Sequence, residues 1–469
     1  MLKAQSAKLD RKKLFGDPVL ITTIVILVIL LTLFILYPLS MLLIDSIWGE
    51  SGLTLSVFGR VLEMGTFRTA FTNTLRLGFI VGIGSTVLGL LFAYVDVYVD
   101  IKSRFVRKLF NVVSMLPVVS PPFVLSLSMI LLFGRGGLIT RSLLHIYDSD
   151  IYGLHGIAIV QILTFFPVCY MMLKGLLKNI DPSLEEASRE RMLIADKSVT
   201  RPLSILCGLF SAFVVLMYIS IPFGALFKLW GRDYSLTLKH FQYMFKYSGL
   251  KAFRDSFVLS LIASPITALF SMIISYLVVK KKFHSKGFIE FVSMLAMAVP
   301  GTVLGVGYIR GFANGVFKTG FLQGLYGTGA ILVIVFIVRS LPVGTRSGIS
   351  ALRQIDKSIE ESAYDLGAGS GKVFTSVTLP LIKDSFLSGL VTTFVRSITA
   401  ISAIILLVTP QYLLITTQIN EFAEKGKYGV ACAYATILIA IVYASIVVMN
   451  FVIKHFGTSK KLKGDSENA

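Results

Sequence analysis

The sequence predicts an all-α integral membrane protein, a polytopic bundle of about ten transmembrane helices in two unequal repeat halves. Three observations support this prediction. Hydrophobic residues fill 55% and charged residues 15% of the 469 positions, with a mean hydropathy of +0.78, which is far too apolar for a soluble globular protein. Long apolar runs follow one another along the chain, and several segments recur at a spacing of about 180 residues.

Ten apolar runs are long enough to cross a bilayer, which takes roughly 20 residues. The first follows the basic segment KLDRKKLF and lacks a small-residue cleavage pattern, so it is predicted to be an uncleaved span. The runs are 18–46, 70–99, 109–133, 153–173, 203–227, 255–279, 287–309, 328–345, 384–408 and 429–453.

The positive charges predict the orientation of these spans. If the amino terminus stays in the cytoplasm, the inner segments carry roughly twice as many Lys and Arg residues as the outer ones. Both termini are therefore expected in the cytoplasm. The net charge of +19 does not indicate nucleic-acid binding, because the positive residues lie at span ends rather than on one soluble face.

The repeat divides the chain into halves of different length. The segment 113–125 recurs at 292–304, with Pro121 matching Pro300, and 179–188 recurs from Gln354. We expect a first half at 1–190 with about four spans and a second half at 191–469 with about six. About two spans are thus missing after the first half's polar loop.

The polar loop of the second half, residues 355–382, predicts a helix-turn-helix on the cytoplasmic side. Ser358 and Glu361 have capping-box spacing, while Asp356 is a competing N-cap. Gly367 is placed to stop the first helix, and a second short helix is expected at about 372–378, before Pro380. The first helix would carry an apolar stripe suited to docking, formed by Ile355, Ile359, Ala363 and Leu366.

The letters GAGSGK inside this loop do not form a phosphate-binding loop. That motif needs glycine five residues before the Gly-Lys pair and Ser or Thr after it, but Leu366 and Val373 stand at those positions. No predicted strand precedes the segment either. We therefore expect no nucleotide binding by this chain itself.

The same loop resembles the EAA coupling loop of ATP-binding-cassette importer permeases. That pattern is Glu-Ala-Ala, three residues, Gly, nine residues and Ile-x-Leu-Pro; here it is Glu361-Ser362-Ala363, Gly367 and Val377-Thr378-Leu379-Pro380. The resemblance implies that this loop sits in a cleft of a separate ATPase subunit. It assigns docking to Glu360, Glu361 and Ala363, the turn to Gly367, and the close of the motif to Leu379 and Pro380.

The first-half copy of the motif is degenerate. It begins with Glu185, Glu186 and Ala187, but Met192 stands where the motif has glycine, and no Ile-x-Leu-Pro follows. A single deletion would explain both this failure and the missing spans. It puts in doubt whether the first half can dock an ATPase.

Most of the chain resembles the fused, double-length permeases of ferric-iron importers, through segments such as SPPFVLSLSMILLFGRGGLIT and FVRSITAISAIILLV. The resemblance implies a permease subunit in a bacterial inner membrane, without enzymatic activity of its own. Its expected partners are an ATPase dimer, an extracytoplasmic solute-binding protein that delivers ferric iron, and membrane lipid. Three alternatives stay open: an importer of phosphonate, thiamine or another small solute, an ATP-independent secondary transporter, and a truncated protein unable to transport.

Charges inside the spans give the candidate transport pathway. Arg396 lies halfway along the ninth span and Arg339 in the eighth, and either a cationic pathway wall or an internal structural pair would explain them. Asp96, near the inner end of the second span, could snorkel to the interface. The histidines have no ligand spacing, so we expect no metal site, no cofactor and no enzyme constellation.

Overall fold

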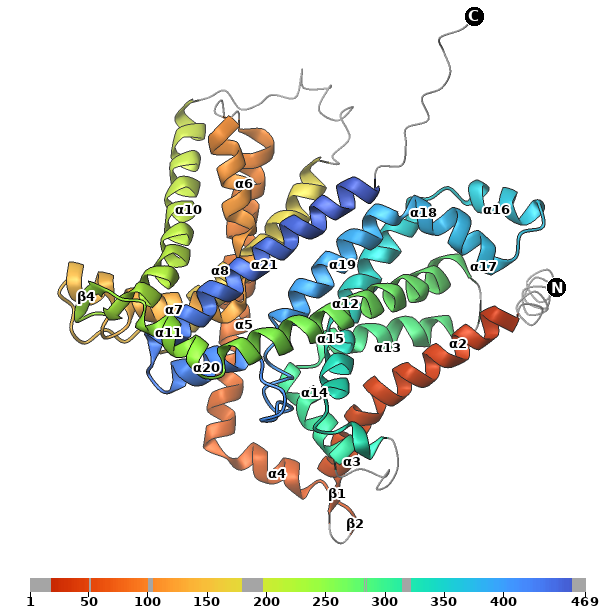
Figure 1. Cartoon of the computed structure of the whole chain (residues 1–469), viewed down its shortest axis with the longest axis horizontal. Coiled ribbons are helices and arrows are strands. Elements are labelled where there is room, and N and C mark those ends of the chain that lie inside the picture. Colours follow the sequence, from red (N-terminus) through yellow and green to blue (C-terminus); the bar gives the residue numbers. More distant parts are fainter. Residues whose placement is uncertain are drawn as a thin grey trace, which may run out of the picture. The chain divides into compact units, whose positions relative to one another are not determined.

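The computed structural model describes residues 18–49, 52–99, 104–178, 197–281, 283, 285–313 and 322–457, and within them it confirms an all-helical membrane protein (Figure 1). Eight helices in these ranges are long and apolar enough to cross a membrane, or nine with one bent pair. A shorter apolar helix, Phe386–Ile398, adds a further element. Each of the ten predicted runs overlaps at least one of these helices.

The predicted runs correspond to helices with slightly different ends. In chain order they are α2 and α3 (Pro18–Leu31, Tyr37–Ile47), α5 (Gly65–Tyr98), α6 and α7 (Arg104–Val119, Pro122–Phe133), α8 (Leu154–Lys178), α10 (Lys197–Leu226), α12 (Gly249–Lys280), α13 and α14 (Lys286–Ala298, Gly301–Tyr308), α15 (Gly329–Arg353), α19 (Lys383–Ile398) and α21 (Tyr428–Gly457).

Short elements connect the long helices. They are π-helical turns η1 (Thr32–Leu36), η2 (Leu138–Leu143) and η3 (Ile309–Ala313), a 3-10 turn η4 (Gln323–Leu325), helices α4 (Ser56–Glu63), α11 (Lys239–Lys246) and α20 (Ile415–Glu424), and two antiparallel hairpins, β1 with β2 (Trp48–Gly49, Gly52–Leu53) and β3 with β4 (Phe227–Leu229, Asp233–Leu236).

Two spans are broken at matching prolines. Helix α7 begins after Pro121 and α14 begins after Pro300, and the axes of α13 and α14 differ by 108°. A proline has no backbone N–H and disfavours helix in the residue before it, so each pair of helices is interrupted there. The two copies of the duplicated segment thus have the same local structure. Pro167 and Pro342, in contrast, lie inside the continuous helices α8 and α15.

The ninth run, predicted as one span over 384–408, is helical only to Ile398. From Thr399 the backbone follows turns and then reaches α20. Within this stretch the Thr416 hydroxyl donates to Ala400 O at 2.7 Å, and just beyond it side chains of α12 accept from the backbone, Asp255 Oδ2 from Leu413 N at 3.1 Å and Ser256 Oγ from Ile415 N at 2.9 Å. The expectation of a full-length helix was wrong because these polar partners stabilise an irregular segment that apolarity alone does not reveal.

The chain forms two compact units that do not follow the sequence halves. One comprises residues 1–55, 251–417 and 443–469, and the other comprises 56–250 and 418–442. Each half therefore contributes its opening span to the unit that holds most of the other half. The halves at 1–190 and 191–469 describe the repeat in the sequence and remain a prediction.

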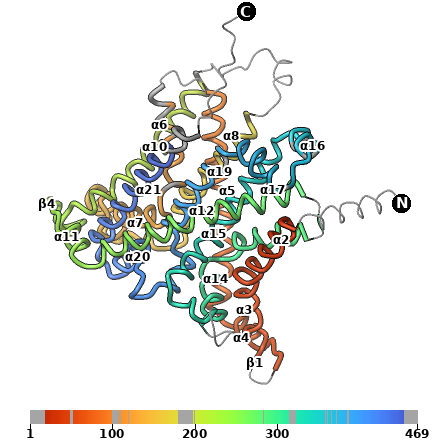
Figure 2. The backbone as a smooth tube through the Cα atoms, turned by 45° about the vertical axis from the view of Figure 1, so that its right-hand side comes forward, coloured from red at the N-terminus to blue at the C-terminus, as the bar shows by residue number. Residues whose placement is uncertain are grey.

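In the first unit the opening helices α2 and α3 pack on the broken span (Figure 2). Tyr308 Oη donates to Phe34 O at 2.6 Å, Tyr37 Oη donates to Gly311 O at 2.8 Å, and the rings of Phe34 and Phe312 stack. Burial of these aromatic side chains and the two hydrogen bonds hold the first span in this position.

The second unit has an aromatic core between α5, α6, α8 and α10. Phe92 is fully buried and contacts Phe110, Phe166 and Phe210, with ring centroids 4.7–5.6 Å apart. The Ser128 hydroxyl on α7 donates to Met217 O on α10 at 2.7 Å. Helix α10, the opening span of the predicted second half, is thereby built into this unit.

Candidate functional site

The loop at 355–382 folds as a helical hairpin, as predicted. Its first helix is α16 (Lys357–Asp365). The second is continuous from α17 (Ser370–Val373) through the π-turn η5 (Phe374–Thr378) to α18 (Leu379–Leu381). It does not end before Pro380, because the π-turn η5 leads without a break into α18, whose first turn contains Pro380.

Asp356, rather than Ser358, caps the start of α16. Ser358 N donates to Asp356 Oδ1 at 3.0 Å, whereas the Ser362 hydroxyl donates back to Ser358 O. The hydrogen bonds from the Ser358 N–H and hydroxyl lower the pKa of the Asp356 carboxyl below its ordinary value. Of the two N-caps that the sequence allowed, the aspartate is therefore the one used.

Gly367 terminates α16 with a positive φ of 83°. Ala368 N donates to Ala363 O at 3.1 Å, which is the long hydrogen bond of a Schellman turn. A Cβ at Gly367 would meet no atom within 4 Å, so the demand for glycine comes from the backbone conformation and not from space.

The second helix is anchored in the first unit by a small hydrophobic cluster. Ile382 is 3% exposed and Leu352 of α15 is fully buried, and Leu379 packs against them. The Phe374 ring meets the Tyr276 ring of α12 edge-on, with centroids 4.9 Å apart. The hairpin is thus fixed at its second helix to both α12 and α15.

The first helix presents its outer face to solvent. Leu366 is 89% exposed and Ile359 is 44% exposed, while Glu361 is also exposed and Ala363 is half-buried. Ile355, the first residue of the predicted stripe, packs in the anchoring cluster instead. The predicted stripe therefore splits into an anchored end and an exposed end.

Some predicted residues lie outside the described part of the structure. Glu185, Glu186 and Ala187 of the first-half motif fall in the undescribed residues 179–196, and the side chain of Glu360 in α16 is likewise outside the description. Among the described residues, Asp96 does not snorkel: it forms an ion pair with Lys174 and accepts a hydrogen bond from Tyr170 Oη at 2.9 Å.

Arg339 on α15 caps a broken helix. Its Nη1 donates to Ala296 O at 2.9 Å and to Val299 O at 3.0 Å, at the carboxyl end of α13 where Pro300 interrupts the span. Carbonyl groups left free inside a membrane are costly unless a partner satisfies them. The geometry therefore gives Arg339 a structural role, whatever else it contacts.

Arg396 on α19 has a different environment. Its side chain is exposed and makes no hydrogen bond or ion pair within the described ranges, and it lies close enough to Arg339 for the two charges to repel. Thr392 and Ser388, four and eight residues earlier, are exposed on the same face of the helix. This face is polar and exposed although it belongs to an apolar segment, and the Thr392 hydroxyl on it donates to Ser388 O at 2.9 Å.

Helices α12 and α15 meet through a contact that the sequence reasoning missed. A Cβ on Gly344 would lie 2.3 Å from Ser271 Oγ, and one on Gly348 would lie 2.4 Å from Ser275 Oγ. The Ser275 hydroxyl donates to Thr345 O at 2.9 Å. The signal was present as two glycines four residues apart, the small-residue spacing of tightly packed membrane helices.

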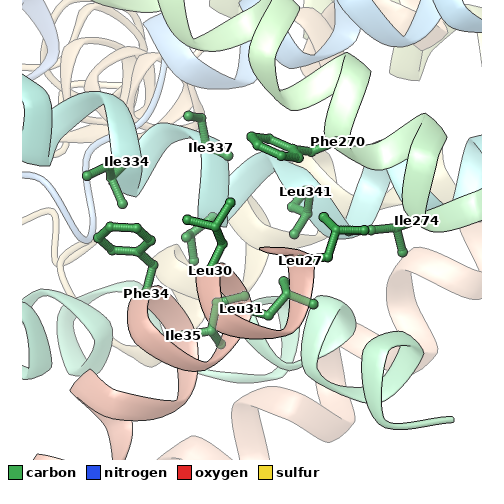
Figure 3. Close-up of a pocket in the computed structure, with 11 residues that line it drawn as sticks. Leu27, Leu30, Leu31, Phe34, Ile35, Phe270, Ile274, Ile334, Ile337 and Leu341 are labelled. Atoms are coloured by element: carbon green, nitrogen blue, oxygen red, sulfur yellow. The ribbon is translucent and has the colours of Figure 1, made fainter. Parts of the chain in front are cut away.

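The described part also contains a purely apolar pocket of about 180 Å³ in the first unit (Figure 3). Leu27, Leu30, Leu31, Phe34 and Ile35 come from α2 and η1, and the other lining residues from α12 and α15 are Phe270, Ile274, Ile334, Ile337, Val338 and Leu341. A polar cargo would find no hydrogen-bond partner among these side chains, so this pocket does not suit one.

Comparison with known proteins gives a consistent family. The sequence model of a protein family described as "binding-protein-dependent transport system inner membrane component" matches residues 268–461. This range contains the hairpin. The ferric transport system permease protein FbpB of Actinobacillus pleuropneumoniae is 30% identical over 555 residues, covering 94% of this chain and 79% of that protein.

Other similar proteins have the same kind of description. A Haemophilus influenzae protein named as a ferric transport system permease is 30% identical over 511 residues, covering 85% of this chain and 79% of the relative. A molybdate/tungstate transport system permease of Thermococcus kodakarensis is 24% identical and covers 53% of this chain and 93% of its own length. Among solved structures, a bacterial alginate ABC transporter chain has a TM-score of 0.45 at 18% identity, covering 58% of this chain and 99% of its own.

Proposed function

The chain belongs to the family of binding-protein-dependent transport permeases that includes the ferric transport system permeases, and from this premise we propose that it imports ferric iron as the permease subunit of an ATP-binding-cassette transporter. The observation that carries the choice of cargo is the 30% identity to a ferric permease across 94% of the chain. Ferric iron is here the cargo and not a resident cofactor.

We propose that the hairpin of α16 to α18 docks the ATPase. Its exposed Leu366 and Ile359 offer apolar area to a partner, and the exposed Glu361 offers a charge at the rim. Glu360 and Ala363 share the same helix, Gly367 sets the turn, and Leu379 and Pro380 lie in α18, which joins the hairpin to α19. ATP hydrolysis itself then belongs to the partner subunit.

The packing around the hairpin supports transmission of its movement into the spans. Helix α18 leads directly into α19, and Phe374 and Ile382 tie the hairpin to α12 and α15. Because Gly344 and Gly348 bring α12 and α15 into backbone-close contact, a displacement of the hairpin would move these helices together rather than slide one past the other.

We propose that the polar face of α19 lines the transport pathway. An arginine without a partner is costly in lipid, so Arg396 is best placed toward a water-filled route or another polar surface. A cationic wall suits an anionic or anion-complexed cargo. Arg339 would add positive potential there, in addition to its hydrogen bonds with Ala296 O and Val299 O.

The wider assembly follows from the same premise. The charge distribution favours a multi-pass protein of the bacterial inner membrane with both termini in the cytoplasm. That orientation puts the hairpin on the side of an ATPase dimer and the opposite loops on the side of an extracytoplasmic binding protein. Nothing in this assignment requires enzymatic activity of the permease chain or contact with nucleic acid.

A second candidate function is a permease-like protein that binds an ATPase without transporting. One observation favours it: the alignment with the ferric permease runs over 555 residues, more than the 469 of this chain, so the relative contains inserted sequence that this chain lacks. Two missing spans in the first half would have this effect.

Uptake of radioactive ferric iron separates these candidates. Membrane vesicles containing the chain, its cognate ATPase and its binding protein are expected to accumulate iron only with ATP, and not when the ATPase is omitted. Uptake that persists without the ATPase would indicate a secondary transporter. ATPase binding with no iron uptake would indicate the non-transporting protein.

A further inference from the structure

A second pocket lies in the other unit, far in sequence from the hairpin. Its volume is about 410 Å³, and it is formed by the β3 and β4 hairpin, helix α11 and the turn between α20 and α21. Strand β4 and helix α11 are labelled at the left of Figure 1. The lining residues are Lys228, Leu229, Trp230, Lys239, His240, Tyr243, Gly426, Lys427, Tyr428, Gly429 and Val430.

The charge of this pocket is of one sign. Its lining contains three lysines and a histidine but no carboxylate. Lys228 has a partner outside the lining, Asp233, at 3.2 Å. Lys239 and Lys427 form no ion pair within the described ranges, and Lys427 Nζ instead lies 5.3 Å from the centroid of the Tyr243 ring. Like charges gathered in one pocket repel, so an anion bound there would be favoured.

The pocket lies where membrane spans end. The apolar segment Thr200–Leu226 ends just before β3, and the apolar segment Tyr428–Phe451 begins in the pocket itself. Tryptophan, tyrosine and lysine are the residues that gather at the level of lipid headgroups. The lining combines all three with the apolar side chains of Leu229 and Val430, as expected at that depth.

Helix α11 gives independent evidence of the same depth. It begins and ends with lysines, and the apolar side chains around it are exposed: Leu238 at 60%, Phe245 at 45% and Tyr247 at 62%. A short helix that exposes large apolar groups beside lysines is typical of one lying in the membrane interface. In such a position the Lys239 ammonium group would lie at the level of the lipid phosphates.

We propose that this pocket binds the phosphate of an anionic phospholipid headgroup. Lys239 and Lys427 contact the phosphate oxygens, Trp230 and Tyr428 flank the glycerol region, and the acyl chains leave along Leu229 and Val430. The bound headgroup connects β3 and α11, which are neighbours in sequence, to the start of α21, which lies about 190 residues later. The proposal depends only on the membrane location of the chain and not on its cargo or its ATPase.

Tryptophan fluorescence can test the proposal directly, because the chain contains only Trp48 and Trp230. In the full-length Trp48→Phe protein in detergent, the remaining tryptophan lines the pocket. Titration with dihexanoyl phosphatidylglycerol is expected to change its emission saturably, at concentrations at least roughly fivefold lower than dihexanoyl phosphatidylcholine requires.

Lysine substitutions identify the site. Lys239→Gln and Lys427→Gln are each expected to weaken phosphatidylglycerol binding roughly fivefold. Lys425→Gln is the matched control, because Lys425 lies on the same turn but pairs with Glu421 outside the pocket, and binding should not change.

Four results would overturn the proposal. Equal affinity for the two lipids would exclude recognition of an anionic headgroup, and so would unchanged binding by both lysine variants. Glycerol 3-phosphate or inorganic phosphate binding as tightly as the lipid would assign the pocket to a free oxyanion. If Lys239→Gln and Lys427→Gln no longer captured the solute-binding protein but still bound the lipid, the pocket would be assigned to a protein partner. If a lysine variant fails to fold, the comparison of ligands with the unsubstituted pocket still decides.

Discussion

At the scale of single residues, the hairpin depends on two backbone requirements. Gly367 must adopt a positive φ, and Asp356 must accept the first free N–H of α16. The sequence predicted the turn at Gly367, but it left two N-caps open, Ser358 by its capping-box spacing and Asp356 as a competitor, and the structure uses Asp356. Local hydrogen bonding decides which residue caps the helix. The Asp356 carboxylate lies one residue before α16 and accepts from the N–H of the second helical residue, Ser358.

Replacing Gly367 by valine is expected to destabilise the hairpin by about 1–2 kcal/mol, because a β-branched residue is strained at positive φ. Hydrogen exchange of the α16 amides should accelerate accordingly. Gly369→Ala is the matched control, since Gly369 has ordinary φ and open space around it. Equal exchange in the two variants would show that the turn does not depend on the left-handed conformation.

Asp356 makes the start of α16 sensitive to acid. Because its pKa is lowered in the folded hairpin, the cap is fully present above the ordinary aspartate pKa and is lost as pH falls through the lowered value. Asp356→Asn should remove this pH dependence while keeping the first turn of α16 capped. Asp356→Ala should leave the first turn of α16 uncapped, and therefore open to protease, at all pH values. Limited proteolysis at 357–365 between neutral and acidic pH measures both.

The two arginines should separate in function and stability. Arg339→Met leaves Ala296 O and Val299 O without a partner and is expected to lose about 2 kcal/mol or more of folding stability. Arg346→Met, on the same helix, has no such bond within the described ranges and should change stability little. Thermal unfolding in detergent gives the comparison.

Arg396→Gln, in contrast, should reduce iron uptake several-fold while leaving thermal stability and ATPase binding unchanged, and Arg396→Lys should restore part of the uptake. The reason is that we propose the Arg396 charge for the pathway, while its exposed side chain has no hydrogen bond or ion pair within the described ranges. A loss of stability as large as that of Arg339→Met would instead show that Arg396 is structural.

At the scale of elements, apolar periodicity predicted where the spans lie but not how each is interrupted. The prolines at 121 and 300 do break spans, yet Pro167 and Pro342 lie within continuous helices. The difference arises from partners that are distant in sequence. At Pro300, for example, Arg339 donates to the carbonyl oxygen of Ala296 at the end of α13, and a local sequence pattern does not reveal such a partner. The early end of α19 escaped prediction for the same reason, since the side chains that bind the irregular backbone between Ala400 and Ile415, those of Thr416, Asp255 and Ser256, all lie outside the run 384–408.

The contact between α12 and α15 has a testable consequence for coupling. Gly344→Leu would place a side chain against Ser271 and is expected to cost about 1–3 kcal/mol through overpacking. Gly389→Leu, where a Cβ meets nothing within 4 Å, is the control. If both variants unfold at the same temperature, close approach of these helices does not stabilise the unit.

At the scale of the whole molecule, repetition in the sequence predicted related halves, but not the exchange of their opening spans between compact units. The first span packs on the broken span of the second half through Tyr308 and Phe34, and α10 packs on α7 through Ser128. These contacts join residues separated by roughly 90 to 270 positions, beyond the range of any periodicity argument. The exchange places a first-half helix beside the second-half hairpin, since Leu20 and Thr23 of α2 line one pocket with Phe374 and Thr375.

The central claim is that one helical hairpin connects this membrane protein to an external ATPase. Co-purification of the cognate ATPase with the wild-type chain and with the Glu361→Arg, Gly367→Val double variant tests it most directly. We expect the wild type to retain the ATPase and the correctly inserted double variant to lose it at least roughly tenfold. Retention of the ATPase by the double variant at the wild-type level would contradict the account.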